Sequence, residues 1–497
     1  MFMFKNIIAN YVGKIWGIIS VFVFVPFYIK ILGIESYAVI NFYTVILTIM
    51  YFADGGLSAT LNREIARSTD KEYIGNMLFT IEKVYLAICL FIMVFVFSLS
   101  GIIARNWLNS DTITADDLSL YVSLMGVSVA FQLFTTLQNS GLMGLEKQVL
   151  SNGIQVASSV VRSAVVLIPL YLYPSLLTFF IWQLSTNIIF FFITRYNLWK
   201  YIKTNITYKF DKQVLKTVGK FAGGMMLMAI ISSLNTQIDK LVISKLLSLK
   251  EFGYYALAGI LSQVPEMIIT PIAMGILPRM VKYSEKTERD KLTKLFHVNS
   301  FILSSLATSG AMVLFLFTKD FIFIWTHDID IANTIENVTR VLLIGGVFLA
   351  FQYMPYYLAI ANGHTRTNVR LGIVALICIV PALIFFVKHY GLIGATYTWL
   401  IMNLFAYIYL GYFLISRFLK NEFKRWFINE TLIPLIIAIV IGVTSYFLTF
   451  DLQKGYFVLL YSVIIGLISL AVNLVVFNKM NPEYKINIRQ AITDGKI

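Results

Sequence analysis

Two basic side chains interrupt apolar stretches of this sequence, where a charge needs a partner or a wet surrounding. Arg162 follows Val160-Val161, and Lys14 stands near the start of the first apolar run. A guanidinium offers paired donors that match phosphate and carboxylate oxygens, so Arg162 is a candidate ligand for an anion. The alternative is that Arg162 pairs with an acidic residue and fixes packing. For Lys14, contact with a bound anion and extension of the ammonium toward lipid headgroups both stay open.

Two acidic side chains stand beside residues that break helices. Asp54 precedes Gly55-Gly56, and Glu266 lies between Pro265 and Pro271. Such breaks free backbone carbonyls, and a broken membrane helix lines a cavity more often than it faces lipid. A carboxylate in that position can carry a proton or bind a cation. Glu266 and Asp54 are therefore candidates for ion coupling, and the alternative for each is a structural ion pair or a hydrogen-bonded bend.

A further polar patch contains Asp239 and Lys240, which are adjacent in the sequence. On a helix, neighbours point about 100° apart, so these two do not face each other. Each then needs a partner elsewhere, and Arg162 is one option for Asp239. A structural gate and a contact with a bound substrate both remain open for this pair.

Uncharged polar residues in apolar stretches add to the prediction of a wet cavity, because amides and aromatic faces bind polar ligands such as sugars. These residues are Gln132, Gln138, Asn139, Asn187, Asn235, Gln237, Gln352 and Asn403. The four histidines are scattered and form no pair with metal-ligand spacing, so no metal or other cofactor is expected.

The elements that carry these residues must be membrane helices. The 497 residues are 58% hydrophobic and 13% charged, with a mean hydropathy of +0.77. A soluble domain has roughly 25% charged residues, so most of this chain has too little polar surface to face water. The apolar runs are about 18–25 residues long, whereas strands of a membrane barrel are about 10 residues of alternating polarity. The sequence therefore predicts an all-α polytopic membrane protein.

Run length and breaker residues predict about fourteen transmembrane helices. The predicted ranges are 7–30, 36–58, 80–103, 118–140, 152–172, 175–195, 217–246, 252–277, 296–318, 338–360, 369–388, 391–416, 430–449 and 456–477. The seventh range is the most polar. Between these ranges no loop is long enough for a separate soluble domain, and the largest outward loop is predicted at about 319–337.

The net charge of +14 does not indicate nucleic-acid binding, because the basic residues lie between apolar runs and not in one patch. In a membrane protein, Lys and Arg on the cytoplasmic side set orientation. With the N-terminus inside, roughly 29 Lys and Arg fall on the inner side and about 8 on the outer side. Both termini are then cytoplasmic, which agrees with an even number of helices. The expected location is the bacterial cytoplasmic (inner) membrane, with anionic lipid in contact with the basic loops.

An internal repeat divides the chain. Residues 30–38 resemble residues 245–253 at the same spacing, Leu61-Asn62-Arg63 resembles Leu277-Pro278-Arg279, and the Gly144 region resembles the Gly363 region, all at an offset of about 215–219 residues. Parallel repeats of this kind are typical of transporters, and the substrate path is expected between the halves. We predict a six-helix lobe over residues 1–210, a second over 211–420, related by a pseudo-two-fold axis, and an added helix pair with a cytoplasmic tail over 421–497.

With these features, the chain resembles the polysaccharide transporter branch of the multidrug/oligosaccharidyl-lipid/polysaccharide (MOP) exporter superfamily, which includes O-antigen and capsule repeat-unit flippases. The resemblance extends over nearly the whole chain. It rests on Ile31-Leu32-Gly33 through Tyr37, on residues 53–57 followed by Arg63-Glu64, and on residues 237–240 followed by residues 252–255.

The resemblance implies a flippase that moves undecaprenyl-pyrophosphate-linked oligosaccharide repeat units by alternating access through a central cationic cavity. Arg162, Lys14, Asp239 and Lys240 would then contact the pyrophosphate or acidic sugars, or line the cavity. No nucleotide-binding motif is present, so energy is expected from a proton or sodium gradient, the membrane potential, or consumption of the substrate on the far side. A polysaccharide polymerase and a chain-length regulator are the expected protein partners.

Three other functions stay open. A peptidoglycan-precursor (lipid II) flippase also has fourteen helices, whereas multidrug exporters of the same superfamily have twelve. A membrane glycosyltransferase or polymerase would explain Asp328-Ile329-Asp330, which mimics a D-x-D motif, but such enzymes carry a sizeable outward loop or domain that this chain lacks. A transporter is therefore expected in place of an enzyme.

Overall fold

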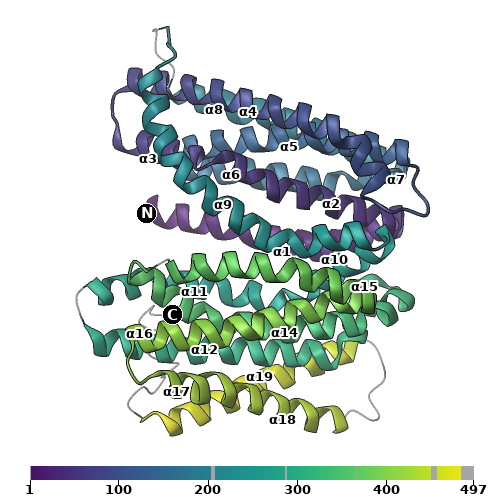
Figure 1. Ribbon diagram of the computed structural model, residues 1–497, viewed down its shortest axis with the longest axis vertical. Coiled ribbons are helices and arrows are strands. Elements are labelled where there is room, and N and C mark those ends of the chain that lie inside the picture. Colours follow the sequence, from purple (N-terminus) through teal and green to yellow (C-terminus); the bar gives the residue numbers. More distant parts are fainter. Residues whose placement is uncertain (1, 203–206, 286–287, 365, 449–455, 483–497) are drawn as a thin grey trace. The chain divides into compact units, whose positions relative to one another are not determined.

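The computed structural model describes residues 2–202, 207–285, 288–364, 366–448 and 456–482, and within these ranges helices follow one another along the chain (Figure 1). Contacts divide the chain into two compact units, residues Met1–Gly253 (unit 1) and Tyr254–Ile497 (unit 2). The predicted boundaries at 210 and 420 differ from this division and stay predictions.

Unit 1 contains the elements that build the cavity described below. They begin with α1 (Phe2–Leu32), α2 (Ile34–Met50), the short 3-10 helix η1 (Tyr51–Asp54) and α3 (Leu57–Arg67). The later elements are α4 (Lys71–Asn106), α5 (Ala115–Gly144), α6 (Gln148–Val160), the π-helical turn η2 (Val161–Val165), α7 (Leu167–Leu172), α8 (Leu176–Ile202), α9 (Lys212–Leu246) and the start of α10 (Leu249–Ser262). Helix α5 packs against α3, α4 and α8, and α1 packs against α6.

Unit 2 continues through the rest of α10 to the last helix. Its elements are α11 (Val264–Glu285), α12 (Arg289–Leu316), α13 (Thr318–Thr326), α14 (Ile329–Ala361), α15 (Arg366–Leu410), η3 (Gly411–Ile415), α16 (Ser416–Phe418), α17 (Phe423–Arg425), η4 (Trp426–Leu432), α18 (Ile433–Leu448) and α19 (Tyr456–Met480). Helix α12 is central, because α11, α14, α18 and α19 all pack against it.

The fourteen predicted membrane helices all fall on helical segments of the described chain. Eleven helices there are long and apolar enough to cross a membrane. One of them, Arg366–Phe418, holds two predicted helices, which meet where Gly391 takes a φ of 59°. The two remaining predicted helices correspond to α1, with its shorter apolar segment Ile19–Leu32, and to the polar α9. The prediction of a polytopic all-α membrane protein is therefore confirmed.

Several predicted helices are interrupted, two of them at glycine or proline residues. The second is interrupted at Gly55 and Gly56, whose φ angles of 52° and 81° favour glycine. The eighth divides between Ser262 and Val264, just before Pro265, which has no N–H to donate. The fifth contains the π-helical turn at 161–165, which its apolar pattern did not indicate.

The predicted outward loop at about 319–337 is wrong, because this segment is almost entirely helical. Helix α13 ends at Thr326, and α14 begins at Ile329. The Asp328 carboxylate accepts from the backbone N–H groups of Asp330 and Ile331, at 2.9 and 3.0 Å. Asp328 is therefore the N-cap of α14, and helix capping explains the D-x-D pattern.

Candidate functional site

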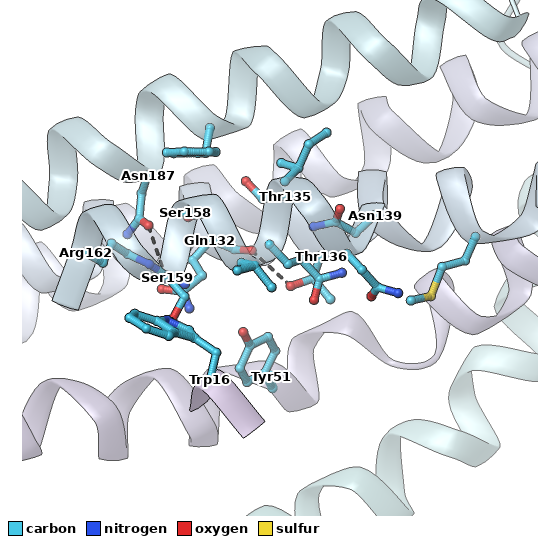
Figure 2. A pocket seen from close by; sticks show the side chains of 16 residues that line it. Trp16, Tyr51, Gln132, Thr135, Thr136, Asn139, Ser158, Ser159, Arg162 and Asn187 are labelled. Atoms are coloured by element: carbon cyan, nitrogen blue, oxygen red, sulfur yellow. Dashed lines mark hydrogen bonds between the residues drawn. The ribbon is translucent and has the colours of Figure 1, made fainter. Parts of the chain in front are cut away.

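A cavity of about 510 Å³ lies inside unit 1, and most of the residues that line it carry a hydroxyl or amide group (Figure 2). Its residues come from α1, η1, α5, α6, η2 and α8. The polar ones are Tyr51, Gln132, Thr135, Thr136, Asn139, Asn152, Gln155, Ser158, Ser159, Arg162 and Asn187, and the indole of Trp16 lies beside them. Of the lining residues that the structure describes, Arg162 alone carries a charge.

Two helices contribute most of this polar wall through the spacing of their residues. On α5 the cavity residues Gln132, Thr135 and Asn139 recur at intervals of three and four. On α6 and η2, positions 152, 155, 159 and 162 recur in the same way. Intervals of three and four place side chains on one face of a helix, so each segment turns a polar stripe toward the cavity.

Arg162 has an uncharged partner. Its Nη1 lies 3.5 Å from Oδ1 of Asn187, and no ion pair in the described part of the chain includes Arg162. The alternative that an acidic residue holds this guanidinium therefore finds no support there. A guanidinium has five N–H donors, so one long contact with an amide leaves donors for an anion in the cavity.

A buried network fixes the orientation of Asn187. Its Nδ2 donates to Ser128 Oγ at 2.7 Å and to the Tyr43 hydroxyl at 3.3 Å. The Tyr43 hydroxyl in turn donates to Gln132 Oε1 at 3.2 Å. Because these hydroxyl groups take the amide N–H groups, the amide oxygen is left to face Arg162. The network thus joins α2, α5 and α8 behind the guanidinium.

Asp54 lies at the break between η1 and α3, where its carboxylate is already occupied. It accepts from the backbone N–H of Gly56 at 3.2 Å and of Ser58 at 3.1 Å, and from the hydroxyl groups of Ser58 and Tyr85. These contacts satisfy the first turn of α3, as an N-cap does. The geometry favours the hydrogen-bonded bend, and the predicted role in ion coupling stays a prediction.

Glu266 lies in the first turn of α11, in unit 2, whereas the cavity lies in unit 1. Its Oε1 accepts from the Tyr353 hydroxyl of α14 at 2.7 Å, and this hydroxyl is 3.0 Å from Thr270 Oγ1. The carboxylate is partly exposed and beside Pro265. Its predicted role as an ion-coupling group is compatible with this position and remains a prediction.

Three other predicted site residues are not brought to the described wall of the cavity. Asp239 and Lys240 lie on α9, and Nζ of Lys240 is 3.2 Å from Oε1 of Gln237 on the same helix. Neither is among the residues that line the cavity. Lys14 belongs to α1, and its side chain lies outside the described residues.

Sequence reasoning identified part of this site. Of the predicted uncharged polar residues, Gln132, Asn139 and Asn187 line the cavity with Arg162. The prediction did not include Asn152, Gln155, Ser158, Ser159 and the two threonines of α5. A signal for them was present, since on the predicted fifth helix polar residues recur every three or four positions as far as Arg162.

Comparison with known proteins places the chain among membrane transporters. The model of a family described as polysaccharide biosynthesis protein matches residues 3–284. A putative O-antigen transporter of Shigella flexneri is 23% identical over 407 residues, which are 79% of this chain and 94% of that protein. The capsular polysaccharide biosynthesis protein CapF of Staphylococcus aureus is 24% identical over 230 residues, 44% of this chain and 55% of that protein.

Solved structures share the fold. The lipid II flippase MurJ has a TM-score of 0.74 at 16% identity, over 95% of this chain and 98% of that one. An inward-facing multidrug resistance transporter of the MATE family, in the MOP superfamily, has a TM-score of 0.68 at 16% identity, over 83% of this chain and 96% of that one. Together with the sequence matches, these likenesses confirm the predicted resemblance to the MOP superfamily.

Proposed function

Because the chain belongs to the polysaccharide biosynthesis protein family, we propose that it is a flippase for lipid-linked oligosaccharides in the building of a surface polysaccharide. The substrate would be an undecaprenyl-pyrophosphate-linked repeat unit of the O-antigen or capsule type. The observation that carries this proposal is Arg162, a guanidinium with an amide partner in a cavity lined by amides and hydroxyls. The names of the relatives support the same class of substrate.

The chemistry of the cavity suits the headgroup of such a substrate. Arg162 offers bidentate donors to a pyrophosphate, and charge-assisted hydrogen bonds of this kind are the strong ones. The amides and hydroxyls around it donate to and accept from sugar hydroxyls, and the ring of Trp16 offers an apolar face. A headgroup in this cavity exchanges water for protein hydrogen bonds, which removes most of the cost of leaving water.

Transport requires that the cavity open to each side of the membrane in turn.

We place the protein in the cytoplasmic membrane with both termini inside, as the distribution of Lys and Arg indicates. Glu266 is the stronger candidate for coupling to a proton or sodium gradient, because among the described residues its carboxylate accepts a hydrogen bond from one other helix, through Tyr353. A polysaccharide polymerase and a chain-length regulator are the proposed protein partners.

Complementation of a gene deletion tests this function. We expect the deletion to lose surface polymer and to accumulate undecaprenyl-linked repeat units on the cytoplasmic side. The wild-type chain should restore export, whereas Arg162→Ala at matched protein level should not, because the anion loses its paired donors. Arg67→Ala is the matched control, since the Arg67 side chain is 69% exposed and forms only a long surface ion pair, with 3.9 Å between its Nη1 and Oε1 of Glu64.

Two outcomes would count against the proposal. If repeat units reach the outer leaflet in the deletion strain and only their polymerisation fails, the chain does not flip them. If peptidoglycan precursor accumulates in place of repeat units, the substrate is lipid II. In that case the likeness to MurJ would extend from fold to function.

A further inference from the structure

The backbone that carries Arg162 is an unusual one. Residues Val161–Val165 form a π-helical turn between α6 and α7. A π turn pairs each residue with the fifth one along the chain and is wider than an α turn, and such turns are frequent at functional sites. The widening disturbs the regular pairing of backbone carbonyls, so these groups need donors from outside the helix.

Three side chains supply those donors to three successive carbonyls. The indole N–H of Trp182 donates to the carbonyl of Val161 at 2.9 Å, and Nε2 of Gln183 donates to that of Arg162 at 2.9 Å. The Tyr28 hydroxyl donates to the carbonyl of Ser163 at 2.6 Å. Trp182 and Gln183 belong to α8, and Tyr28 belongs to α1. The turn is therefore fixed from two neighbouring helices.

The side chains that support the turn are buried, and they are linked to the Arg162 side chain. Tyr28 and Gln183 are each only 7% exposed, so their polar atoms are committed to the turn. The middle carbonyl of the three belongs to Arg162 itself, whose side chain lines the cavity. Asn187, the partner of the guanidinium, lies one helical turn after Gln183 on the same helix, α8. Helix α8 thus holds the main chain of Arg162 through one residue and its side chain through another.

We propose that Tyr28, Trp182 and Gln183 are positioning residues that keep the wide turn open and so direct Arg162 into the cavity. If these side-chain donors are removed, the backbone carbonyls of residues 161–163 lose their partners. They can then be satisfied again by a return of the turn to ordinary α-helical hydrogen bonding. A change of one residue in helical register turns side chains by up to about 100°, which moves Arg162 away from Asn187. The inference rests on the proposed function only in assigning Arg162 to the substrate.

Chemical labelling tests the position of residue 162 without any substrate. The protein is purified with Arg162→Cys in a background that lacks the exposed thiol of Cys378, and a charged, water-soluble thiol reagent is added.

The donor variants are Tyr28→Phe and Gln183→Leu, made separately and together. Each deletes a hydrogen-bond donor and keeps most of the side-chain volume. We expect both to slow labelling at residue 162, and the double variant to slow it most. Thr136→Cys, which faces the same cavity from α5, should label at an unchanged rate.

The matched control for the loss of a hydroxyl is Tyr171→Phe, since Tyr171 lies on α7 with its side chain 64% exposed. In cells that keep Arg162, the double variant should export polymer about tenfold less than wild type, because a reacting or binding group that is displaced by about 1 Å loses much of its effect. The Tyr171→Phe chain should export normally.

Two labelling results would overturn the inference. Unchanged labelling at residue 162 in every donor variant would show that Tyr28 and Gln183 do not set its position. Equal changes at residues 162 and 136 would indicate general loosening of the unit. Neither result bears on the proposed function, because labelling needs no transport. The export test with Arg162→Ala decides that function separately.

Discussion

A single side chain, Arg162, connects the sequence to the proposed chemistry. Its apolar neighbours in the sequence are enough to make it a candidate, because an arginine in a membrane helix is expensive and is rarely without a role. The sequence could not name its partner, since Asn187 lies 25 residues away on another helix. A pairing with Asp239, which the sequence left open, is not among the ion pairs of the described residues. Only the packing of helices decides which polar residues meet.

Replacing the amide partner Asn187 with a carboxylate should prevent anion binding without removing Arg162. In Asn187→Asp the new carboxylate lies within reach of the guanidinium and takes the donors that an anionic substrate would use. We expect surface polymer at matched protein level to fall nearly as far as in Arg162→Ala. Asn187→Ser, which adds no charge, should lose much less. Full export by Asn187→Asp would mean that Arg162 does not bind the anion.

At the level of helices, run length and breaker residues were sufficient to predict where helices lie but not how they are interrupted. A pair of glycines predicts a break in a helix, as at Gly55-Gly56. The π turn at 161–165 has no such marker, because donors from α1 and α8 maintain it. The segment 319–337 resembles a loop in the sequence because its polar residues include a helix cap, Asp328.

The break in the second helix permits a test of Asp54. Asp54→Ala removes the acceptor for the first turn of α3, and loss of such a cap costs about 0.5–2 kcal/mol, so the unfolding temperature in detergent should fall. Asp54→Asn keeps an acceptor oxygen and should retain both stability and export. If Asp54→Asn folds normally but exports nothing, the carboxylate charge itself is needed, and the predicted role in ion coupling would gain support.

The C-terminal helix pair is attached to α12 through a largely buried cluster of ionisable side chains. His297, fully buried, places Nδ1 2.5 Å from Oε1 of Glu430 and Nε2 3.1 Å from Oε2 of Glu422. The Glu430 side chain is also fully buried, and Arg425 Nε lies 3.9 Å from it. In the sequence His297 is one of four scattered histidines, because its partners are more than 120 residues away.

Breaking this buried cluster should destabilise unit 2 strongly. In Glu430→Ala the His297 ring loses a fully buried hydrogen-bond partner and Arg425 loses a nearby carboxyl group. A buried polar group left unsatisfied costs about 1–3 kcal/mol of the free energy of unfolding. Denaturation in detergent would measure the loss. Glu285→Ala, at an exposed helix end, is the matched control and should change little. A stability equal to wild type for Glu430→Ala would mean that the cluster does not hold the helix pair.

For the whole molecule, composition and run length predicted a polytopic membrane protein, and the motifs predicted a transporter rather than an enzyme. Both predictions agree with the family to which the chain belongs and with its relatives. The cavity could be predicted only in part, because its wall combines residues of α1, η1, α5, α6, η2 and α8, and several of these elements are far apart in the sequence. The orientation in the membrane stays a prediction from the positions of Lys and Arg.

Reconstitution in vesicles would show whether this chain moves lipid-linked oligosaccharide by itself. The purified protein is placed in liposomes that contain a fluorescent polyprenyl-pyrophosphate-linked repeat unit, and a membrane-impermeant quencher reports how much of it reaches the outer leaflet. We predict that the wild-type chain and Arg67→Ala allow nearly all of the fluorescence to be quenched, while Arg162→Ala leaves the inner-leaflet half protected, as in protein-free vesicles. Protection that is the same with wild-type protein as without it would contradict the flippase function, and rapid quenching with Arg162→Ala would contradict the role given to the cavity.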